Sequence, residues 1–442
     1  MKSPCRRPRS KGCWISDATA ARRAALHILQ AVRSGGTFQA ARDRVLPTLA
    51  PRDRRLAYEL AAGVLRRQAD LDRRLGLRGA DPRLHDVLRL GAYQLAALAR
   101  VPSYAAVATS VELARGLVGE KAARYVNQAL RTLARDAGCG MRDLGDTHPR
   151  WLVARWTTQF GRSDTDRLLT WNDSRAPLTL QPARSDAAAL EARLSEAGFG
   201  VREAPFGAGV VLERGATHPA SRIPHLAQLP GFAEGAFIVQ DPAHALVCRY
   251  ASIPPGMLVY DACAAPGGKA VMLERAGARV VAGDARSERI RRLLETTRRA
   301  GVAIRVTVTD LLSAPFAPRT VPAVLVDAPC SATGTMARHP DARWRVTPRT
   351  IVRCARLQRA LLEAAATLVG PGGVLVYSTC SLEPEENRDI VTQFLASHTD
   401  FARAPVAAAV PASLLTPDGD LQSLPQRDGM DGAYAARLTR TR

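Results

Sequence analysis

The chain has 442 residues, with 62 Lys or Arg against 41 Asp or Glu, which gives a formal net charge of +21 at pH 7. A length prior of about 150 residues per domain predicts roughly three domains. No run of about 18 consecutive apolar residues is present, and the first residues lead into no apolar signal segment, so we expect no membrane span and a cytoplasmic location. Eight cysteines without a Cys-x-x-Cys pair argue against a disulfide framework and a zinc site, and we expect no metal.

The positive charge is concentrated in the first third of the chain. Residues 1–150 carry 28 Lys or Arg against 13 Asp or Glu, whereas residues 151–442 carry 34 against 28. This asymmetry predicts a module that holds nucleic acid, joined to a nearly balanced catalytic module. A solvated, arginine-rich surface would give the same composition and is the alternative.

A helical module is expected at residues 20–140, after a basic flexible N-terminus at residues 1–19. Its apolar residues recur at spacings of three, four and seven, as in Leu84, Val87, Leu88 and Leu95. The pattern predicts an all-α bundle with arginines on its outer faces. Because few aromatic residues lie nearby, we expect these arginines to contact mainly phosphate groups.

A smaller module is expected at residues 148–236, after a Gly- and Asp-rich break at residues 138–149. It contains an alternating stretch at residues 177–180 and a turn-rich passage at residues 229–232. The two together are typical of a compact α+β connector.

Residues 237–442 alternate strand-like and helical runs. Strand-like runs at 258–263, 279–284, 305–310, 323–327 and 374–380 predict βαβ units and a doubly wound, Rossmann-like α/β sheet. Four acids end or nearly end these runs: Asp261, Asp284, Asp310 and Asp327. Because parallel strands end at one edge of a sheet, acids gathered there are expected to surround a polar ligand.

A glycine turn after the first of these strands has the character of a cofactor cradle. It lacks the full Gly-x-Gly-x-x-Gly spacing of dinucleotide sites, so it fits S-adenosylmethionine better than NAD. Asp284, 17 residues past Gly267, is placed to bind ribose hydroxyls, and Asp310 to meet the adenine amino group, unless either acid caps the next helix. The residues expected to bind this cofactor are Cys263, Ala264, Ala265, Pro266, Gly267, Gly268, Lys269, Asp284, Asp310 and Asp327.

Two cysteines set fifty residues apart each close an apolar run: Cys330 in Asp-Ala-Pro-Cys, and Cys380 in Ser-Thr-Cys-Ser. The expected sheet brings both thiols to the edge that carries the cofactor turn. A thiol nucleophile beside a methyl donor points to alkyl transfer onto an unreactive ring carbon. The residues alone do not decide which thiol attacks.

Three long motifs give a family resemblance. The stretches Asp-Ala-Cys-Ala-Ala-Pro-Gly-Gly-Lys at 261–269, Asp-Ala-Pro-Cys-Ser-Ala-Thr-Gly-Thr at 327–335, and Ser-Thr-Cys-Ser-Leu-Glu-Pro-Glu-Glu-Asn at 378–387 resemble the RNA cytosine-C5 methyltransferases of the Nol/Nop/Sun group. The helical module, with Leu-Gly-Ala-Tyr-Gln-Leu at 90–95 and Val-Asn-Gln-Ala-Leu-Arg at 126–131, resembles the NusB-type RNA-binding domain. The combination is similar to bacterial enzymes that modify small-subunit (16S) ribosomal RNA.

The resemblance implies a mechanism and a partner. Cys380 would attack C6 of a cytosine, Cys330 would assist product release, and Asp327 would protonate or hydrogen-bond N3. Ribosomal RNA would be the partner, with no DNA, and we expect a monomer. Gln181 and Ala183 stand near positions where the family usually has Arg and Asn, which bears on RNA placement.

Three other interpretations remain open. The same reaction on transfer RNA is one, and a non-catalytic RNA-binding or ribosome assembly factor is another. An amino-group methyltransferase of the same fold is the third, but these enzymes typically carry a Pro-Pro-aromatic stretch where this chain has Asp-Ala-Pro-Cys at 327–330.

Overall fold

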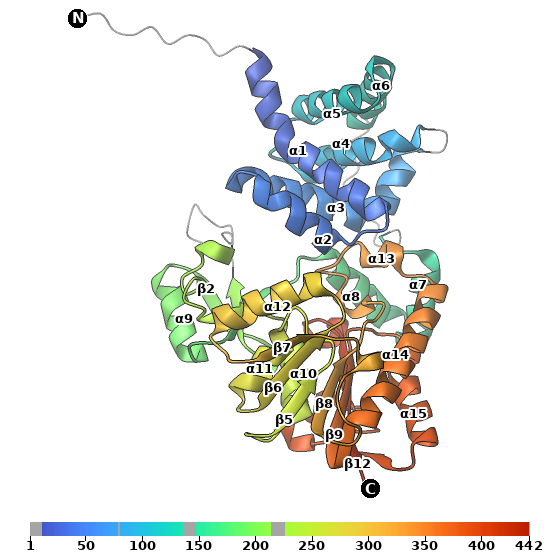
Figure 1. Cartoon of the computed structure of the whole chain (residues 1–442). Helices are drawn as coiled ribbons and strands as arrows, with labels where there is room; N and C mark the ends of the chain where they lie inside the picture. The colour runs from blue at the N-terminus through green and yellow to red at the C-terminus, as the bar shows by residue number, and fades with distance from the viewer. Residues whose placement is uncertain (1–10, 78–79, 136–146, 214–225, 442) are drawn as a thin grey trace, which may run out of the picture. The chain divides into compact units, whose positions relative to one another are not determined.

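The computed structural model describes residues 11–77, 80–135, 147–213 and 226–441 (Figure 1). Two compact units are present, and each is described by itself. The helical unit contains the described residues up to Asp173 together with Arg338–Trp344; the sheet unit contains those of Ser174–Ala337 and Arg345–Arg442. Residues 1–10 of the predicted basic N-terminus and residues 138–146 of the predicted break lie outside the described residues.

The helical unit is all-α in its described residues, as predicted. Thr37 caps α2 by accepting a hydrogen bond from the amide of Ala40 at 3.1 Å, and Gly76 ends α3 with a φ of 56°, a backbone conformation that suits glycine. Because α1 begins at Lys11, the predicted domain start at residue 20 lies inside a helix. The helices are α1 (Lys11–Arg33), α2 (Phe38–Val45), α3 (Pro51–Leu75), α4 (His85–Ala97), α5 (Ser103–Leu117), α6 (Glu120–Arg135), α7 (Arg150–Phe160) and α8 (Arg162–Asp173).

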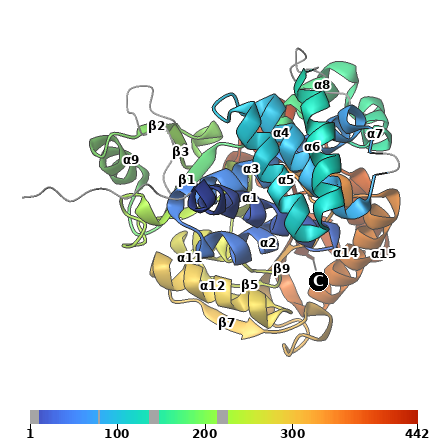
Figure 2. The same ribbon diagram turned by 90° about the horizontal axis from the view of Figure 1, so that it is seen from above.

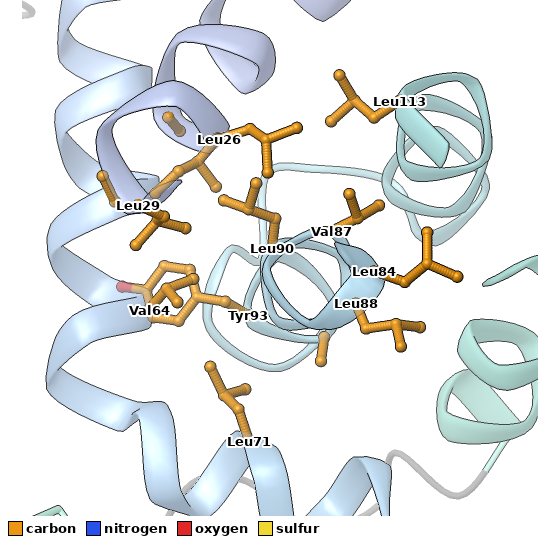
Figure 3. Close-up of a cluster of buried hydrophobic side chains, with 14 of the residues drawn as sticks. Leu26, Leu29, Val64, Leu71, Leu84, Val87, Leu88, Leu90, Tyr93 and Leu113 are labelled. Carbon is orange, nitrogen blue, oxygen red and sulfur yellow. The ribbon is translucent and has the colours of Figure 1, made fainter. Parts of the chain in front are cut away.

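The core of the helical unit lies between α1, α3, α4 and α5 (Figure 3). Leu84, Val87 and Leu88 are buried in it, as their spacing predicted. Tyr93 packs against Gly63, where an added Cβ would lie 2.0 Å from the ring carbon Cζ. The Tyr93 hydroxyl donates to Glu59 at 2.9 Å, so the buried ring keeps its polar end satisfied.

A segment from the C-terminal half of the sequence, Arg338–Trp344, is part of the helical unit. Its Arg343 is fully buried and donates to Asp173 and to the backbone carbonyls of Arg66, Thr147 and Asn172. Burial lowers the pKa of Arg343 to about 10, which leaves it charged at neutral pH. We predicted that this segment belongs to the sheet domain, because its local sequence does not reveal partners that are distant along the chain.

The sheet unit begins with a small antiparallel sheet in the order β2-β3-β1-β4. Its elements are β1 (Leu178–Pro182), α9 (Ala187–Glu196), β2 (Gly200–Glu203), β3 (Val210–Glu213) and β4 (Phe237–Val239). The predicted α+β character is found, but α7 and α8 belong to the helical unit and β4 starts at the predicted boundary with the next domain. Gln181 is buried and donates to the carbonyl of Ala208 at 2.8 Å, so it serves the packing of this sheet.

The large sheet has the order β10-β12-β9-β8-β5-β6-β7, with β11 paired to β12. Strands β5 to β9 are parallel and match the five predicted strands, whereas β10, β11 and β12 are antiparallel and were not predicted. The strands are β5 (Leu258–Asp261), β6 (Arg279–Asp284), β7 (Arg305–Val308), β8 (Val321–Asp327), β9 (Val369–Thr379), β10 (Phe401–Arg403), β11 (Leu421–Ser423) and β12 (Ala433–Arg440).

Helices cover both faces of this sheet (Figure 1). Alternate strand residues face opposite layers: Tyr260, Val324 and Leu375 pack in one cluster, and Val259, Leu325 and Val376 in the other. The first cluster contains residues of α14 (Pro348–Leu368) and α15 (Arg388–Ser397); the second contains residues of α10 (Pro242–Ala251), α11 (Gly268–Arg275) and α12 (Ser287–Ala300). Two short helices, α13 (Ala342–Arg345) and α16 (Pro425–Asp428), complete the described helices. None of the helices in the described ranges is long and apolar enough to cross a bilayer.

Candidate active site

The carboxyl ends of β8 and β9 bring the two predicted thiols together. The strands pair with Asp327 opposite Ser378, so the segments that follow them leave the sheet side by side. The Sγ atoms of Cys330 and Cys380 lie 3.2 Å apart, and both side chains are partly accessible. The expected convergence of the thiols at this edge is therefore found.

The contact between the two thiols affects the pKa of Cys330. The hydrogen bond to Cys380, together with burial, raises the pKa of Cys330 well above its ordinary value. Either sulfur can donate the hydrogen bond that joins them. The contact places both sulfur atoms where one could attack a substrate and the other could assist it, and the geometry alone does not distinguish the two roles.

Lys269 and Asp327 form a buried ion pair at the same edge. The Lys269 ammonium lies 2.7 Å from Asp327 Oδ2 and 3.1 Å from His244 Nδ1, and the Ser378 hydroxyl donates to Asp327 Oδ1 at 3.0 Å. Burial opposes both charges, but their attraction outweighs it, so the pKa of Lys269 is raised and that of Asp327 is lowered. Asp327 is thus an acceptor, and Lys269 is the proton donor of the pair.

Asp261 ends β5, the strand next to β8, and its side chain is fully buried. Neither of its carboxyl oxygens makes a hydrogen bond of ordinary geometry with a described residue. Burial, with the nearby Asp327 carboxylate, raises the pKa of Asp261 to about 7. Such an unsatisfied acceptor fits a ligand that brings its own positive charge or donor group.

Cys380 lies on a turn held by Glu386 and Asn387. The Asn387 side chain donates to the carbonyl of Ser381 at 2.8 Å and accepts from the Thr379 hydroxyl at 2.5 Å. Glu386 accepts from the Ser381 hydroxyl at 3.1 Å. Both residues stand in the third motif but were not predicted to act on the site, because a motif does not reveal which members orient the others.

Glu386 also fixes the loop that carries Cys330. Its second carboxyl oxygen accepts from the amide of Ser331 and from Gln358 Nε2, each at 2.9 Å. Gln358 additionally donates to the carbonyl of Pro329 at 2.9 Å. One buried carboxylate therefore sets the positions of both cysteine loops.

A close backbone approach at Gly334 completes this arrangement. The Gly334 amide donates to the carbonyl of Cys380 at 3.0 Å, and its carbonyl accepts from the amide of Gly432 at 2.8 Å. An added Cβ at Gly334 would lie 2.6 Å from the Gly432 carbonyl oxygen and 2.9 Å from that of Cys380. Only glycine leaves these three segments in contact.

The predicted cofactor turn joins β5 to α11. Gly267 has a φ of 104°, and a Cβ there would lie 2.6 Å from the side chain of Leu293. Cys263, Ala264, Ala265 and Pro266 form the turn itself; Gly268 and Lys269 open α11. Burial raises the pKa of the Cys263 thiol far above its ordinary value.

Two of the predicted acids hold their own loops. Asp284 accepts from the amide of Arg286, and Asp310 from that of Leu312, each in a local turn. Asp284 is buried, and its Oδ2 atom lies 3.1 Å from Arg289 Nη1, whereas Asp310 is exposed. Arg289 also donates to the carbonyl of Ala265 at 2.6 Å, so it ties the turn to β6.

The residues present fit S-adenosylmethionine. Asp261 offers unsatisfied carboxyl oxygens, and the side-chain oxygen of Gln240, a buried atom beside Gly268, also has no hydrogen-bond partner. Backbone without side chains at Gly267 and Gly268 allows close approach of a ligand. Within the described ranges, no three His, Cys, Asp or Glu side chains are grouped as metal ligands.

A parallel sheet with a glycine turn and acids at its carboxyl edge defines the class of S-adenosylmethionine-dependent methyltransferases. Family models match three parts of the chain: 16S rRNA methyltransferase RsmB/F at residues 253–439, the NusB family at 19–135, and the RsmF/B-like ferredoxin-like domain at 148–217. The chain is similar to the probable ribosomal RNA small subunit methyltransferase B of Synechocystis, with 35% identity over 95% of this chain and 99% of that protein. The Vibrio cholerae ribosomal RNA small subunit methyltransferase B is 34% identical, with 97% and 98% covered.

Solved structures agree on the fold. The crystal structure of PH0851 superposes with a TM-score of 0.78 at 24% identity and covers 94% of this chain and 98% of its own. A methyltransferase homolog from Pyrococcus horikoshii gives a TM-score of 0.55 at 25% identity, with 67% and 96% covered. The chain belongs to the RsmB family of ribosomal RNA small subunit methyltransferases, whose cofactor is S-adenosylmethionine.

Proposed function

We propose that this protein methylates C5 of a cytosine in small-subunit ribosomal RNA through a covalent bond between Cys380 and C6. The observation that carries the proposal is the contact between two thiols beside the Lys269–Asp327 pair. S-adenosylmethionine, when bound, supplies the methyl group. RNA is the partner, and we expect the protein to act as a monomer in the cytoplasm.

Attack by Cys380 makes an unreactive carbon nucleophilic. The thiolate of Cys380 forms the S–C6 bond as the electron pair of the C5–C6 double bond moves through C4 toward N3. We assign the proton that N3 takes to the Lys269 ammonium instead of to Asp327, the residue that the resemblance implied, because the ion pair lowers the pKa of Asp327 and keeps it a carboxylate. Asp327 holds that ammonium in place and compensates its charge. C5 is then electron-rich and would take the methyl group from S-adenosylmethionine, whose sulfur–methyl bond would break to leave S-adenosylhomocysteine.

Product release reverses the first step. The C5 proton leaves to a base, its electron pair rebuilds the C5–C6 double bond, and the C6–S bond breaks to return the Cys380 thiolate. The proton on N3 returns to Lys269. We assign assistance in this step to Cys330, whose thiol can stabilise the departing sulfur by the hydrogen bond already present.

The roles of the two thiols can be distinguished because their variants should have opposite phenotypes. Cys380→Ser should abolish methylation, since no adduct can form, whereas Cys330→Ala should accumulate a covalent protein–RNA adduct that shifts on a denaturing gel. The reverse pattern would overturn the role assignment.

The substrate is tested by bisulfite sequencing of ribosomal and transfer RNA from cells with and without the protein. We expect one or few cytosines of small-subunit ribosomal RNA to lose their protection from bisulfite conversion in cells without the protein. Loss confined to transfer RNA would favour the same reaction on that substrate. No change in either RNA, with no binding of S-adenosylmethionine, would favour a non-catalytic assembly factor.

A further inference from the structure

Helices α5 and α6 of the helical unit pack side by side (Figure 2). Residues of both helices line a groove of about 620 Å³. Its floor is apolar and includes Val107, Ala108 and Val111 of α5. Asn127, Arg131 and Arg135 of α6 form the opposite wall, and Tyr104 stands at the first turn of α5. The volume lies within the range of small-ligand sites, roughly 300 to 1,000 Å³.

The groove presents an aromatic ring that the fold does not use. The Tyr104 side chain is 78% exposed, the highest value among the exposed large hydrophobic residues of the described chain. Such a ring contributes little to the core, in contrast with Tyr93, which is buried in the same unit. An exposed ring over an apolar floor is suited to stacking with another flat group.

The charged residues among the described lining of the groove are both arginines. None of these described lining residues is acidic, and Arg131 and Arg135 make no ion pair with another described side chain. The two arginines are one helical turn apart, ~6 Å along the axis, on the same face of α6. Helix α5 has no acid in its first turn and no side-chain cap, so its amino end adds to the positive potential.

Asn127 organises the polar wall. Its side-chain oxygen accepts a hydrogen bond from Arg131 Nε at 3.0 Å, which holds the guanidinium in place. The amide nitrogen of Asn127 is left to donate to a ligand, and the terminal nitrogens of Arg131 are left for an anion. The groove thus combines a stacking surface, one donor for a polar edge and two cations for a polyanionic backbone.

We propose that this groove of the helical unit binds one unpaired nucleotide of the RNA substrate, other than the cytosine that is methylated. The base stacks on Tyr104 over the Val107–Val111 floor, and its neighbouring phosphates contact Arg131 and Arg135. A paired base would hide the face that Tyr104 needs, so the groove selects single-stranded RNA. The inference rests on the proposed function, since it takes RNA as the substrate.

The test uses the full-length protein and a fluorescent single-stranded octauridylate, with a duplex of equal length for comparison. Tyr104→Ala should weaken binding of the single strand roughly 5- to 100-fold, and Tyr104→Phe should retain it, because stacking needs only the ring. Arg131→Gln and Arg135→Gln should each reduce the slope of log affinity against log salt by roughly 0.7. Arg388→Gln, which removes the same charge from α15, is the matched control.

A 5-iodouridine-containing octamer gives a direct readout. Photocrosslinking followed by mass spectrometry should place the modified peptide at Tyr104, and at residue 104 in the Tyr104→Phe variant. Crosslinks only elsewhere, or an unchanged affinity in Tyr104→Ala, would overturn the inference while leaving methylation by the wild type intact. If the wild type neither binds nor methylates RNA, the proposed function itself fails. Altered sedimentation of Tyr104→Ala with unchanged RNA affinity would point to a protein contact and also overturn the inference.

Discussion

A single buried carboxyl links stability to cofactor binding in the sheet unit. Asp261 has no hydrogen-bond partner of ordinary geometry among the described residues, and burial raises its pKa to about 7. The folded protein therefore retains this proton at pH values where the unfolded chain has lost it. A buried carboxyl without a partner lowers the stability of the protein alone, and a cationic ligand that compensates its charge removes this cost.

The pH dependence of unfolding follows from the sign of this shift. Between about pH 4 and pH 7 the folded state binds the Asp261 proton and the unfolded state does not, so this group lowers the free energy of unfolding as pH rises. Its contribution to the slope is roughly 1.4 kcal/mol per pH unit at most. Asp261→Asn should remove this contribution to the pH dependence of the unfolding free energy. Chemical denaturation at pH 5, 6, 7 and 8 without cofactor measures that dependence. A variant with the wild-type slope would contradict the assignment. Asp43→Asn, at a partly exposed aspartate of the helical unit, is the control.

A second prediction concerns the effect of substituting the single residue Gly334. A Cβ there would collide with backbone oxygens of Cys380 and Gly432, which cannot rotate away as a side chain would. We expect Gly334→Ala to lower the rate of methyl transfer at least ~10-fold by displacing Cys380, since small misplacements of reacting groups are costly. Single-turnover assays measure this rate, and calorimetry should show unchanged cofactor affinity.

Gly116 offers the matched glycine control. It lies in α5, and an added Cβ meets nothing within 4 Å. Gly116→Ala should keep full activity and raise the free energy of unfolding by roughly 0.5 to 1 kcal/mol, because alanine favours the helix. Equal losses of activity in both variants would show that Gly334 has no special role.

Among the helices and strands, those with a clear hydrophobic pattern could be predicted from the sequence. The five parallel strands were found because each is a short apolar run, four of them close to an acid. Strand β12 escaped, since its Ala-Tyr-Ala-Ala-Arg-Leu-Thr-Arg sequence shows no clear alternation and it pairs antiparallel at the end of the sheet. The thiols and Lys269 stand in motifs and were predicted; His244, Arg289 and Glu386 depend on distances between elements that no local pattern encodes.

The Arg338–Trp344 segment is an element whose stability can be tested separately. Arg343→Met removes a buried guanidinium and leaves Asp173 and three carbonyls without their donor. We expect a loss of roughly 3 kcal/mol in the unfolding free energy of the helical unit. Hydrogen exchange of α3 and α8 reports on this unit, since Arg343 bonds to residues of both helices. Arg349→Met, an exposed arginine of α14, should leave the exchange unchanged, and equal effects of the two variants would contradict the buried role of Arg343.

In the molecule as a whole, the excess of positive charge and the catalytic groups lie in different parts of the sequence. The described catalytic groups are partly or fully buried and nearly compensated, as in the Lys269–Asp327 pair. The excess of arginine falls instead in the first 150 residues, with 28 Lys or Arg against 13 Asp or Glu. Phosphate contacts should therefore dominate RNA affinity, while the cofactor site should be largely insulated from bulk salt.

Salt titration distinguishes the two sites in one protein. Affinity for a small-subunit ribosomal RNA fragment should fall at least ~100-fold between 50 and 200 mM salt, because bound cations are released from the RNA at every phosphate contact. Affinity for S-adenosylmethionine should change by less than about threefold over the same range, since the groups at its turn are neutral backbone and buried side chains, which bulk salt screens little. Fluorescence anisotropy measures the first quantity and isothermal titration calorimetry the second. An RNA affinity that does not respond to salt would contradict the assignment of the arginine excess to phosphate binding, and equal responses would show that general charge screening controls both sites.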